Sequence, residues 1–150
     1  MRCLLQRVGS EGARVRVDDE VIGEIGRGLV VFVGVGPDDD EGIATAMARR
    51  VAELRIFDDA DGRTNRSLLD VGGEALVVSQ FTLYADTRRG RRPGFTGAAS
   101  PETAERLYLA FADVIRASGI RAATGRFGAV MAVELVNDGP FTIWLDSADR

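Results

Sequence analysis

The sequence predicts an α+β domain in which a mainly antiparallel, barrel-like sheet carries two amphipathic helices. Three observations predict this fold class. Short apolar strands divided by turn residues fill the first third of the chain, two segments repeat apolar residues at helical spacing, and two more strand-like runs close the sequence. The 150 residues suit one domain, 1–150, and a chain of that size can bury roughly 68–70% of its unfolded surface.

Strand-like segments occur in both halves of the chain. Those of the first third indicate an antiparallel meander, and Val15 and Val17 share one face of their strand. The last two segments are joined at 137–140, where an Asp-Gly pair is typical of a tight turn. The expected strands are 1–8, 13–17, 21–25, 28–35, 75–84, 130–136 and 141–145.

The two helices are predicted by different signals. Four acidic residues at 38–41 place negative charge where a helix begins, and an apolar stripe follows them. Ser100 is a plausible N-cap with Pro101 at the first helical position, and Gly119 ends the second helix. The stripe of the first helix comprises Ile43, Ala46, Met47, Val51 and Leu54, and that of the second comprises Ala104, Leu107, Tyr108, Phe111, Val114 and Ile115.

Composition excludes several classes of chemistry. The chain has no histidine and one cysteine, so Ser-His-Asp and Cys-His catalysis, His-ligated metals and an intrachain disulfide are excluded. Every basic residue is arginine and the net charge is −4, which argues against a generic polyanion binder. No apolar stretch approaches the roughly 20 residues of a membrane span and no signal-peptide pattern is present, so we expect a cytoplasmic protein with no membrane partner.

Two polar segments are candidate sites. Ser79 to Leu83 lies in an expected strand, where Ser79, Phe81 and Leu83 would share one face and Gln80 and Thr82 the other. A strand with one wetted face and a ligand site both explain it. The loop with Arg88, Arg89, Arg91 and Arg92 is either a solvated loop or a phosphate clamp.

Two further segments have ordinary structural explanations. Asp58, Asp59 and Asp61 resemble the start of a calcium loop, but Arg63 stands at the next ligand position, so a hairpin is expected. Within 137–142 a trans turn is the ordinary expectation, because only about 5–6% of X-Pro bonds in folded proteins are cis.

Six short motifs in a fixed order resemble the D-aminoacyl-tRNA deacylase family, and the match runs nearly end to end. They are Leu54-Arg55-Ile56-Phe57, Asp70-Val71-Gly72-Gly73, Ser79-Gln80-Phe81-Thr82-Leu83, Gly90-Arg91-Arg92-Pro93, Gly125-Arg126-Phe127-Gly128-Ala129 and Asn137-Asp138-Gly139-Pro140-Phe141-Thr142.

The resemblance implies a homodimeric hydrolase that acts on aminoacyl-tRNA without cofactor or metal. It cleaves the ester between a D-amino acid and the 3′-terminal adenosine, a chiral proofreading reaction, at sites on the subunit interface. The residues Ser79, Gln80, Phe81 and Thr82 of one subunit meet Gly139 and Pro140 of the other, whose peptide bond is cis. The implied substrate-binding residues are Phe127, Asn137, Thr142, Arg88 and Arg91, with Phe127 either stacked on adenine or part of the core.

The stereochemical problem itself favours a backbone filter. Enantiomers differ at Cα only in the positions of hydrogen and Cβ, so a rigid Gly-cisPro wall can bond the substrate ammonium and collide with an L-oriented Cβ. Such a wall would also admit glycine. For the chemistry, the resemblance suggests N–H groups near Gln80 and Phe81 as oxyanion donors and the ribose 2′-hydroxyl as a helper. Alternatives are Thr82 as a covalent nucleophile, a non-catalytic RNA-end binder, and a small-molecule-binding dimer.

Overall fold

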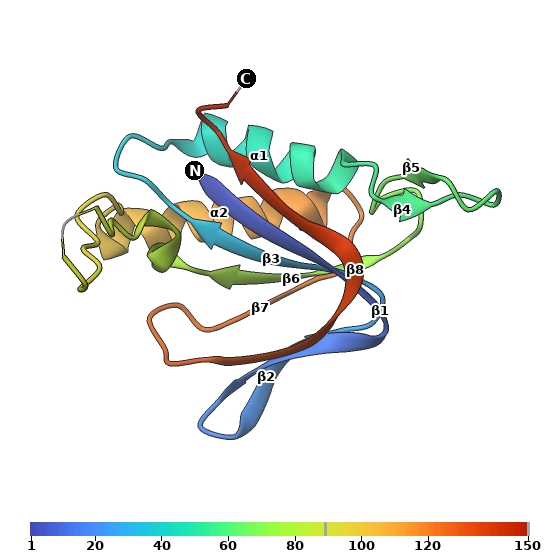
Figure 1. The fold of residues 1–150 in the computed structure, drawn as a ribbon, viewed down its shortest axis with the longest axis horizontal. Coiled ribbons are helices and arrows are strands. Elements are labelled where there is room, and N and C mark those ends of the chain that lie inside the picture. The colour runs from blue at the N-terminus through green and yellow to red at the C-terminus, as the bar shows by residue number, and fades with distance from the viewer. Residues whose placement is uncertain (89, 150) are drawn as a thin grey trace.

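The computed structural model describes residues 1–88 and 90–149 and contains one mixed sheet, a small hairpin and two helices (Figure 1). The large sheet comprises β1 (Arg2–Val17), β2 (Glu20–Ile25), β3 (Gly28–Gly34), β6 (Glu74–Ser79), β7 (Ala122–Thr124) and β8 (Ala132–Asp146). The remaining elements are α1 (Glu41–Glu53), the hairpin strands β4 (Phe57–Asp58) and β5 (Thr64–Arg66), the 3-10 helix η1 (Phe81–Tyr84) and α2 (Pro101–Ala117).

The sheet order is β2-β1-β3-β6-β7, with β8 on β1. Pairs of β1 with β2, β3 and β8 are antiparallel, whereas β3-β6 and β6-β7 are parallel. The predicted meander is therefore wrong, because β2 and β3 both pair with β1. The sheet is mixed, and three of the five pairings among its described strands are antiparallel. The parallel pairs arise because α1 and α2 lie in the connections between the paired strands, and such crossovers return the chain in the same direction.

The sheet curls into a nearly closed, barrel-like shape. Its end strands approach one another so closely that a Cβ on Gly23 in β2 would lie 2.7 Å from the carbonyl oxygen of Thr124 in β7. Both helices pack against the same face (Figure 1). The larger hydrophobic cluster lies between helices and sheet, and a smaller one lies inside the curl.

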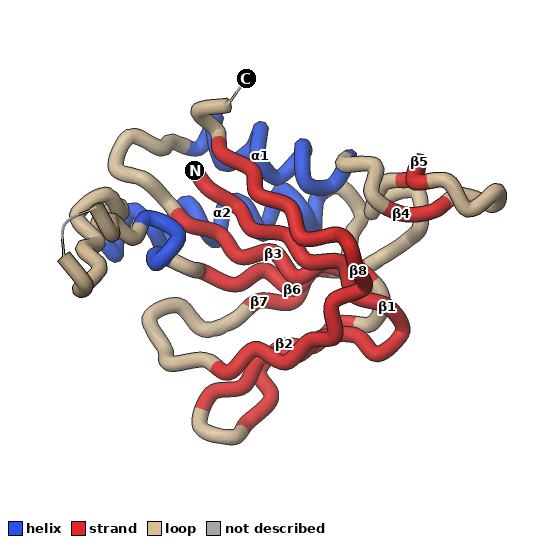
Figure 2. The backbone as a smooth tube through the Cα atoms, in the orientation of Figure 1, coloured by secondary structure: helices blue, strands red, loops and turns tan. Residues whose placement is uncertain are grey.

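Two long strands replace four predicted short ones, as the bent tube in Figure 2 shows. Residues 1–8 and 13–17 form one strand, and 132–136 and 141–146 form another. Between the pairs Gln6–Thr142 and Val8–Asn137, one residue of β1 faces four of β8; between Val8–Asn137 and Ala13–Leu135, four residues of β1 face one of β8. The turn signals at 9–12 and 137–140 thus mark two opposed bulges.

The helix signals are confirmed. The Asp40 side chain accepts a hydrogen bond from Ile43 N–H at 2.8 Å and caps α1. Ser100 caps α2, with Pro101 at its start. In α1 the exposed Ala46 lies outside the buried stripe, which instead includes Ala44 and Ala48.

The expected hairpin is also present, because β4 and β5 pair antiparallel around Asp58 and Asp61. Within 1–88 and 90–149 no helix is long and apolar enough to cross a membrane.

Candidate functional site

A cleft of about 500 Å³ opens where the end of β6, η1, the 95–104 segment and the 127–133 segment meet. Four of the predicted site residues line it: Ser79, Gln80, Phe81 and Phe127. Its other walls are largely apolar and include Val35, Phe95, Ala98, Ala104 and Met131. Two of the six sequence motifs, 79–83 and 125–129, therefore meet in one cavity.

The polar segment 79–83 does not continue as a strand. After the Gln80 N–H donates to Val33 O at 2.8 Å, the chain turns into η1, and the Leu83 N–H returns to Gln80 O at 3.2 Å. The predicted alternation of side chains through 79–83 is therefore wrong beyond Ser79. A Cβ on Gly34 would lie 3.0 Å from Gln80 O, so a side chain at this position would press on η1.

Arg2 holds η1 from the opposite side. Its Nη1 donates to Leu83 O at 2.9 Å, and its guanidinium lies 4.3 Å from the Tyr84 ring centroid. Nε of Arg2 also forms an ion pair with Asp146 Oδ2 at 2.9 Å. Burial raises the pKa of the Tyr84 hydroxyl, so the ring stays neutral beside the cation.

Phe127 is both a lining residue and a neighbour of the core. Its ring centroid is 6.3 Å from that of Tyr108, whose buried hydroxyl donates to Val77 O at 2.9 Å. The Gly125 N–H donates to the same carbonyl at 3.1 Å. The two explanations offered for Phe127 are thus compatible, because the ring packs against the larger core cluster and still lines the cleft.

Thr82 is exposed and is not among the residues that line the cleft. Its hydroxyl accepts a hydrogen bond from the Gln80 side-chain amide. Within the described residues, no group of three or more His, Cys, Asp or Glu side chains could hold a metal ion.

The arginine-rich loop follows η1 and ends just before Phe95, a residue that lines the cleft. Asp86 and Gly94 pair through two backbone hydrogen bonds of 2.8 and 2.9 Å, which close the loop at its base. Arg88 donates through Nε and Nη2 to the carboxylate of Asp86, and these bonds hold the pKa of that carboxyl well below its usual range. Arg91 is exposed, and Arg89 lies outside the described residues.

The segment 137–142 contains the bulge of β8, and the Gly139-Pro140 peptide bond is cis. Asn137 Nδ2 donates to Phe141 O at 3.0 Å and to Arg7 O at 3.1 Å. Thr142 Oγ1 donates to Asn137 Oδ1 at 3.2 Å. The two side chains predicted to bind substrate thus form hydrogen bonds that shape the bulge of the same chain.

Arg7 is the anchor that sequence reasoning missed. It is 6% exposed, and its Nη1 donates to Ile56 O at 2.7 Å. Nε lies 2.9 Å from Asp138 Oδ2, an ion pair that is not aligned as a hydrogen bond, and the guanidinium lies 4.3 Å from the Phe141 ring centroid. The sequence does contain a signal for this anchor: Arg7 falls on the same inward face of its strand as Cys3 and Leu5, where a charged residue is unusual.

Within a single chain, residues 137–142 lie far from the cleft. Val8 pairs with Asn137 on one edge and with Gly28 on the other, whereas Ser79 pairs with Val33. Gly28 and Val33 are five residues apart along β3, which corresponds to roughly 17 Å. The cleft and the Gly139-Pro140 bulge therefore lie at different ends of the sheet.

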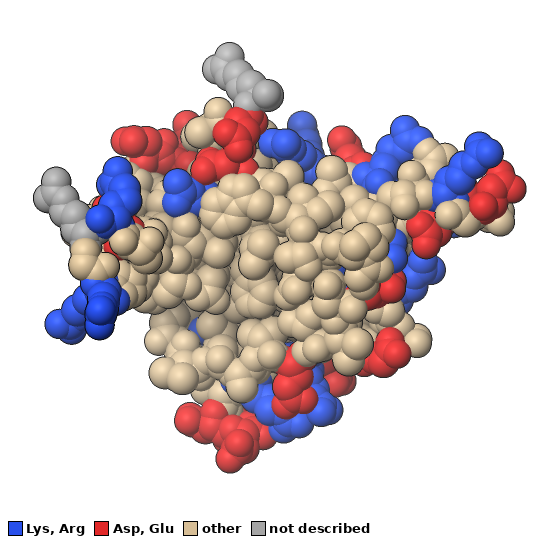
Figure 3. Space-filling view, viewed as in Figure 1, with Lys and Arg blue, Asp and Glu red and all other residues tan. Residues whose placement is uncertain are grey.

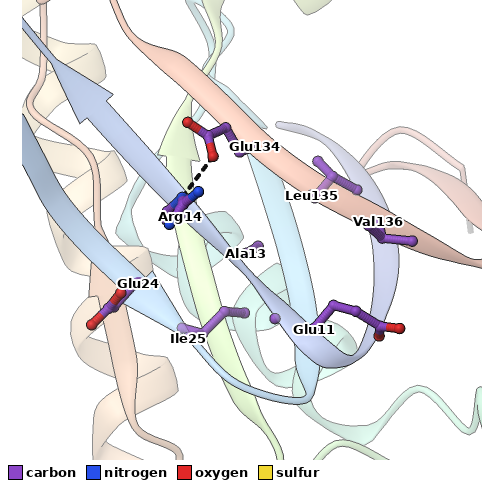
Figure 4. A pocket seen from close by; sticks show the side chains of 9 residues that line it. Glu11, Ala13, Arg14, Glu24, Ile25, Glu134, Leu135 and Val136 are labelled. Carbon is purple, nitrogen blue, oxygen red and sulfur yellow. Dashed lines mark hydrogen bonds and ion pairs between the residues drawn. The ribbon is translucent and has the colours of Figure 1, made fainter. Parts of the chain in front are cut away.

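A second hollow of about 320 Å³ lies between β1, β2 and β8 (Figure 4). Glu134 lies at its edge and pairs with Arg14 and Arg16 at 2.6 Å each. Both arginines hold the pKa of Glu134 below its usual range through these hydrogen bonds. None of the predicted site residues line this hollow, and a further hollow beside Tyr84 contains only Arg88 of them, whereas four line the cleft beside η1, which is therefore the candidate site.

Comparison with known proteins agrees with the motifs. The D-Tyr-tRNA(Tyr) deacylase family profile matches residues 4–146. The D-aminoacyl-tRNA deacylase of Roseiflexus sp. (strain RS-1) is 60% identical over 148 residues, 99% of this chain and 94% of that protein. That of Dinoroseobacter shibae is 60% identical over 146 residues, 97% of this chain and 99% of that protein.

Solved structures show the same fold. A chain described as c-Myc DNA Unwinding Element Binding Protein has a TM-score of 0.90 at 38% identity and covers 97% of this chain and 98% of its own. A probable eukaryotic D-amino acid tRNA deacylase has a TM-score of 0.83 at 19% identity, with 96% and 97% covered. With a family profile that spans nearly the whole sequence and relatives at 60% identity, this chain belongs to the D-Tyr-tRNA(Tyr) deacylase family.

Proposed function

We propose that this chain hydrolyses the ester between a D-amino acid and the 3′-terminal adenosine of tRNA, and does so in the cleft beside η1. The chain is a D-aminoacyl-tRNA deacylase, a hydrolase of aminoacyl-tRNA esters. One observation supports this location: Ser79, Gln80, Phe81 and Phe127 line the same cavity. A cytoplasmic location goes with a tRNA substrate.

The dimensions and walls of the cleft support an aminoacyl-adenosine ligand. About 500 Å³ falls within the range of roughly 300–1,000 Å³ usual for small-molecule sites, and apolar walls with a few polar groups are typical of them. Phe127 offers a ring face, and bases at single-stranded RNA ends are commonly held by stacking on aromatic side chains. We therefore assign the terminal adenine to Phe127.

The chemistry proceeds without a histidine. The ester is activated by its neighbouring ribose 2′-hydroxyl, so the protein has to position it and stabilise the oxyanion. The Gln80 N–H already donates to Val33 O, whereas Phe81 begins η1, where first-turn N–H groups have no partner within the helix. Of the two donors suggested earlier, the Phe81 N–H is the better candidate.

Thr82 as a covalent nucleophile is the competing mechanism. Its exposed hydroxyl accepts from the Gln80 amide, and an amide cannot act as a base that would activate it. Thr82→Ala is expected to retain near-normal kcat. Loss of turnover in a variant that still folds and binds tRNA would favour the nucleophile instead.

The chiral filter comes from a second copy of the chain. Gly139 and Pro140 are exposed and lie roughly 17 Å along the sheet from the cleft of their own subunit, so they can line a cleft only in another molecule. A two-fold symmetric dimer would exchange them reciprocally. Their carbonyl groups would then bond the substrate ammonium and exclude an L-oriented Cβ, as a rigid wall does.

Subunit mixing tests this arrangement. A Cβ on Gly139 would meet no atom within 4 Å in its own subunit, so Gly139→Val is expected to fold and to block the cleft of its partner. Ala98→Trp fills the cleft itself. Refolding the two inactive variants together should restore about a quarter of the wild-type sites, because half of the dimers are mixed and each has one intact site. Recovery of no activity would contradict shared sites.

Incubation with D-tyrosyl-tRNA and L-tyrosyl-tRNA tests the function itself. Release of only the D-amino acid supports the deacylase. Unchanged tRNA together with measurable binding would instead support a non-catalytic RNA-end binder, and the absence of both would leave a small-molecule-binding dimer.

Glycyl-tRNA distinguishes a backbone wall from recognition of the D side chain. Glycine has no Cβ, so the wall excludes L-residues but admits glycine. We expect glycyl-tRNA to be cleaved. Inertness toward it, with D-tyrosyl-tRNA hydrolysed normally, would refute the wall.

A further inference from the structure

Two phenylalanine rings stand together at the mouth of the cleft. Phe81 is 54% exposed, which is unusual for so large an apolar side chain, while Phe95 is half-buried. Their ring centroids are 4.9 Å apart at an interplanar angle of 68°, an edge-to-face contact that holds the Phe81 ring in place. The exposed ring is therefore braced and presents a fixed apolar face to solvent.

The arginine-rich loop begins and ends beside these rings. η1, with Phe81, precedes Asp86, and Phe95 follows Gly94, so the backbone pairing of Asp86 with Gly94 places the ring pair at the foot of the loop. Figure 3 shows basic side chains gathered at this end of the molecule. In the described part of the chain, Arg91 and Arg92 are exposed and form no ion pair.

An aromatic platform beside unpaired cations is the usual construction of a site for single-stranded nucleic acid. Bases stack on the rings and arginines contact the backbone phosphates. The terminal adenosine occupies the cleft, so the nucleotide on its 5′ side has to leave through the mouth. The exposed Phe81 ring lies at the edge of the cleft, and Arg91 and Arg92 belong to the loop that begins and ends beside the ring pair.

We propose that the Phe81–Phe95 pair binds the base of the nucleotide that precedes the terminal adenosine, and that Arg91 and Arg92 bind the adjoining phosphates. This inference rests on the proposed function, and it adds a second nucleotide subsite outside the cleft. The subsite recognises a single-stranded 3′ end by stacking and charge and takes any base, because every base has a π-face.

Substrates of different length test the ring pair. We would measure kcat/KM for D-tyrosyl esters of adenosine and of the dinucleotide CpA with wild-type protein, Phe95→Leu and Phe81→Leu. The ratio of CpA ester to adenosine ester should fall about tenfold in both variants, as expected for loss of one base stack. Leu109→Ala, an exposed apolar residue on α2 outside the cleft lining, should leave the ratio unchanged.

Any other outcome of these measurements would contradict the proposed subsite. An equal fall for both esters would place the rings in contact with the adenosine or the ester, and no change would leave them without a role in binding. A fall for D-tyrosyl-adenosine that is absent for D-alanyl-adenosine would make the rings an amino-acid pocket. Unfolding midpoints of both variants establish that the fold is retained.

Binding separates failure of this proposal from failure of the proposed function. The function is wrong if wild-type protein does not cleave D-tyrosyl-tRNA; calorimetric affinities for uncharged CpA and adenosine then give the same comparison without turnover. The expected result is tighter binding of CpA by wild-type protein and loss of that difference in Phe95→Leu. Equal affinity of wild-type protein for the two would overturn the subsite.

Salt dependence tests the arginines. Arg91→Gln and Arg92→Gln should each reduce the slope of log kcat/KM for D-tyrosyl-tRNA against log salt by roughly 0.7, the value for one phosphate contact on a single strand. Arg49→Gln removes the same charge from an exposed position on α1 and should leave the slope unchanged. If Arg91→Gln and Arg92→Gln show the same slope as Arg49→Gln, the proposed phosphate contacts are wrong.

Discussion

Replacing Arg7 should loosen the bulge that presents Gly139 and Pro140. The guanidinium connects three parts of the chain, because it donates to Ile56 O at 2.7 Å, pairs with Asp138 at 2.9 Å and lies over the Phe141 ring at 4.3 Å. Arg7→Met retains most of the buried side-chain volume and removes all three contacts. The variant therefore isolates the polar anchoring from simple packing.

The expected loss of unfolding free energy is about 2–6 kcal/mol. A buried hydrogen bond from a charged donor contributes roughly 1.5–3 kcal/mol. The contact with the Phe141 ring adds roughly 0.5–2 kcal/mol. The ion pair adds at most about 1 kcal/mol, because the Asp138 side chain is 49% exposed and stays solvated when its partner is removed.

Urea unfolding at one fixed protein concentration measures this loss. Trp144 is the sole tryptophan, lies on β8 and is 46% exposed, so its emission reports the strand that carries the bulge. Arg49→Met, at an exposed position, should change the free energy by less than about 0.5 kcal/mol. A double-mutant cycle with Asp138→Asn should show coupling of about 1 kcal/mol. A loss below about 1 kcal/mol for Arg7→Met would refute the anchoring role.

Three further measurements follow from single contacts. Cys3 is fully buried and burial raises its pKa to about 12, so Ellman's reagent should find no thiol in native protein and one in denaturant. Gly36→Ala should lower the unfolding free energy by about 1–3 kcal/mol, because the new Cβ would lie 2.7 Å from the Tyr84 hydroxyl oxygen. Thermal or urea unfolding should show a cost of about 1 kcal/mol for Asp40→Ala and about 0.5 kcal/mol for Ser100→Ala, since their cap hydrogen bonds measure 2.8 and 3.4 Å.

Local signals in the sequence predicted the helices and the small hairpin correctly. Capping residues act on the first turn that follows them, so Asp40 and Ser100 can be read without knowing the rest of the fold. Strand pairing depends instead on residues far apart in the chain. The parallel pairs of β6 could not be inferred from 75–84 alone, because an apolar run looks the same in either orientation.

The candidate site could be predicted only in part, because it too depends on contacts between residues far apart in the chain. Motif resemblance identified Ser79, Gln80, Phe81 and Phe127, which meet in the cleft. It could not show that the chain after Ser79 turns into a 3-10 helix, because that turn depends on close packing against Gly34 of a neighbouring strand.

The two opposed bulges let one sheet present an exposed segment without disturbing its core. Each bulge inserts three extra residues into its strand. Because three is an odd number, one such bulge without the other would shift the pairing so that inward side chains face outward. Because β1 and β8 each carry one, the register of Arg2–Asp146 is restored at Arg16–Ala132. Leu5 is buried in the larger hydrophobic cluster and Val15 in the smaller one, so both halves of β1 contribute to the core. The core of the chain therefore fixes the position of the β8 bulge, while the exposed residues of that bulge remain available to another molecule.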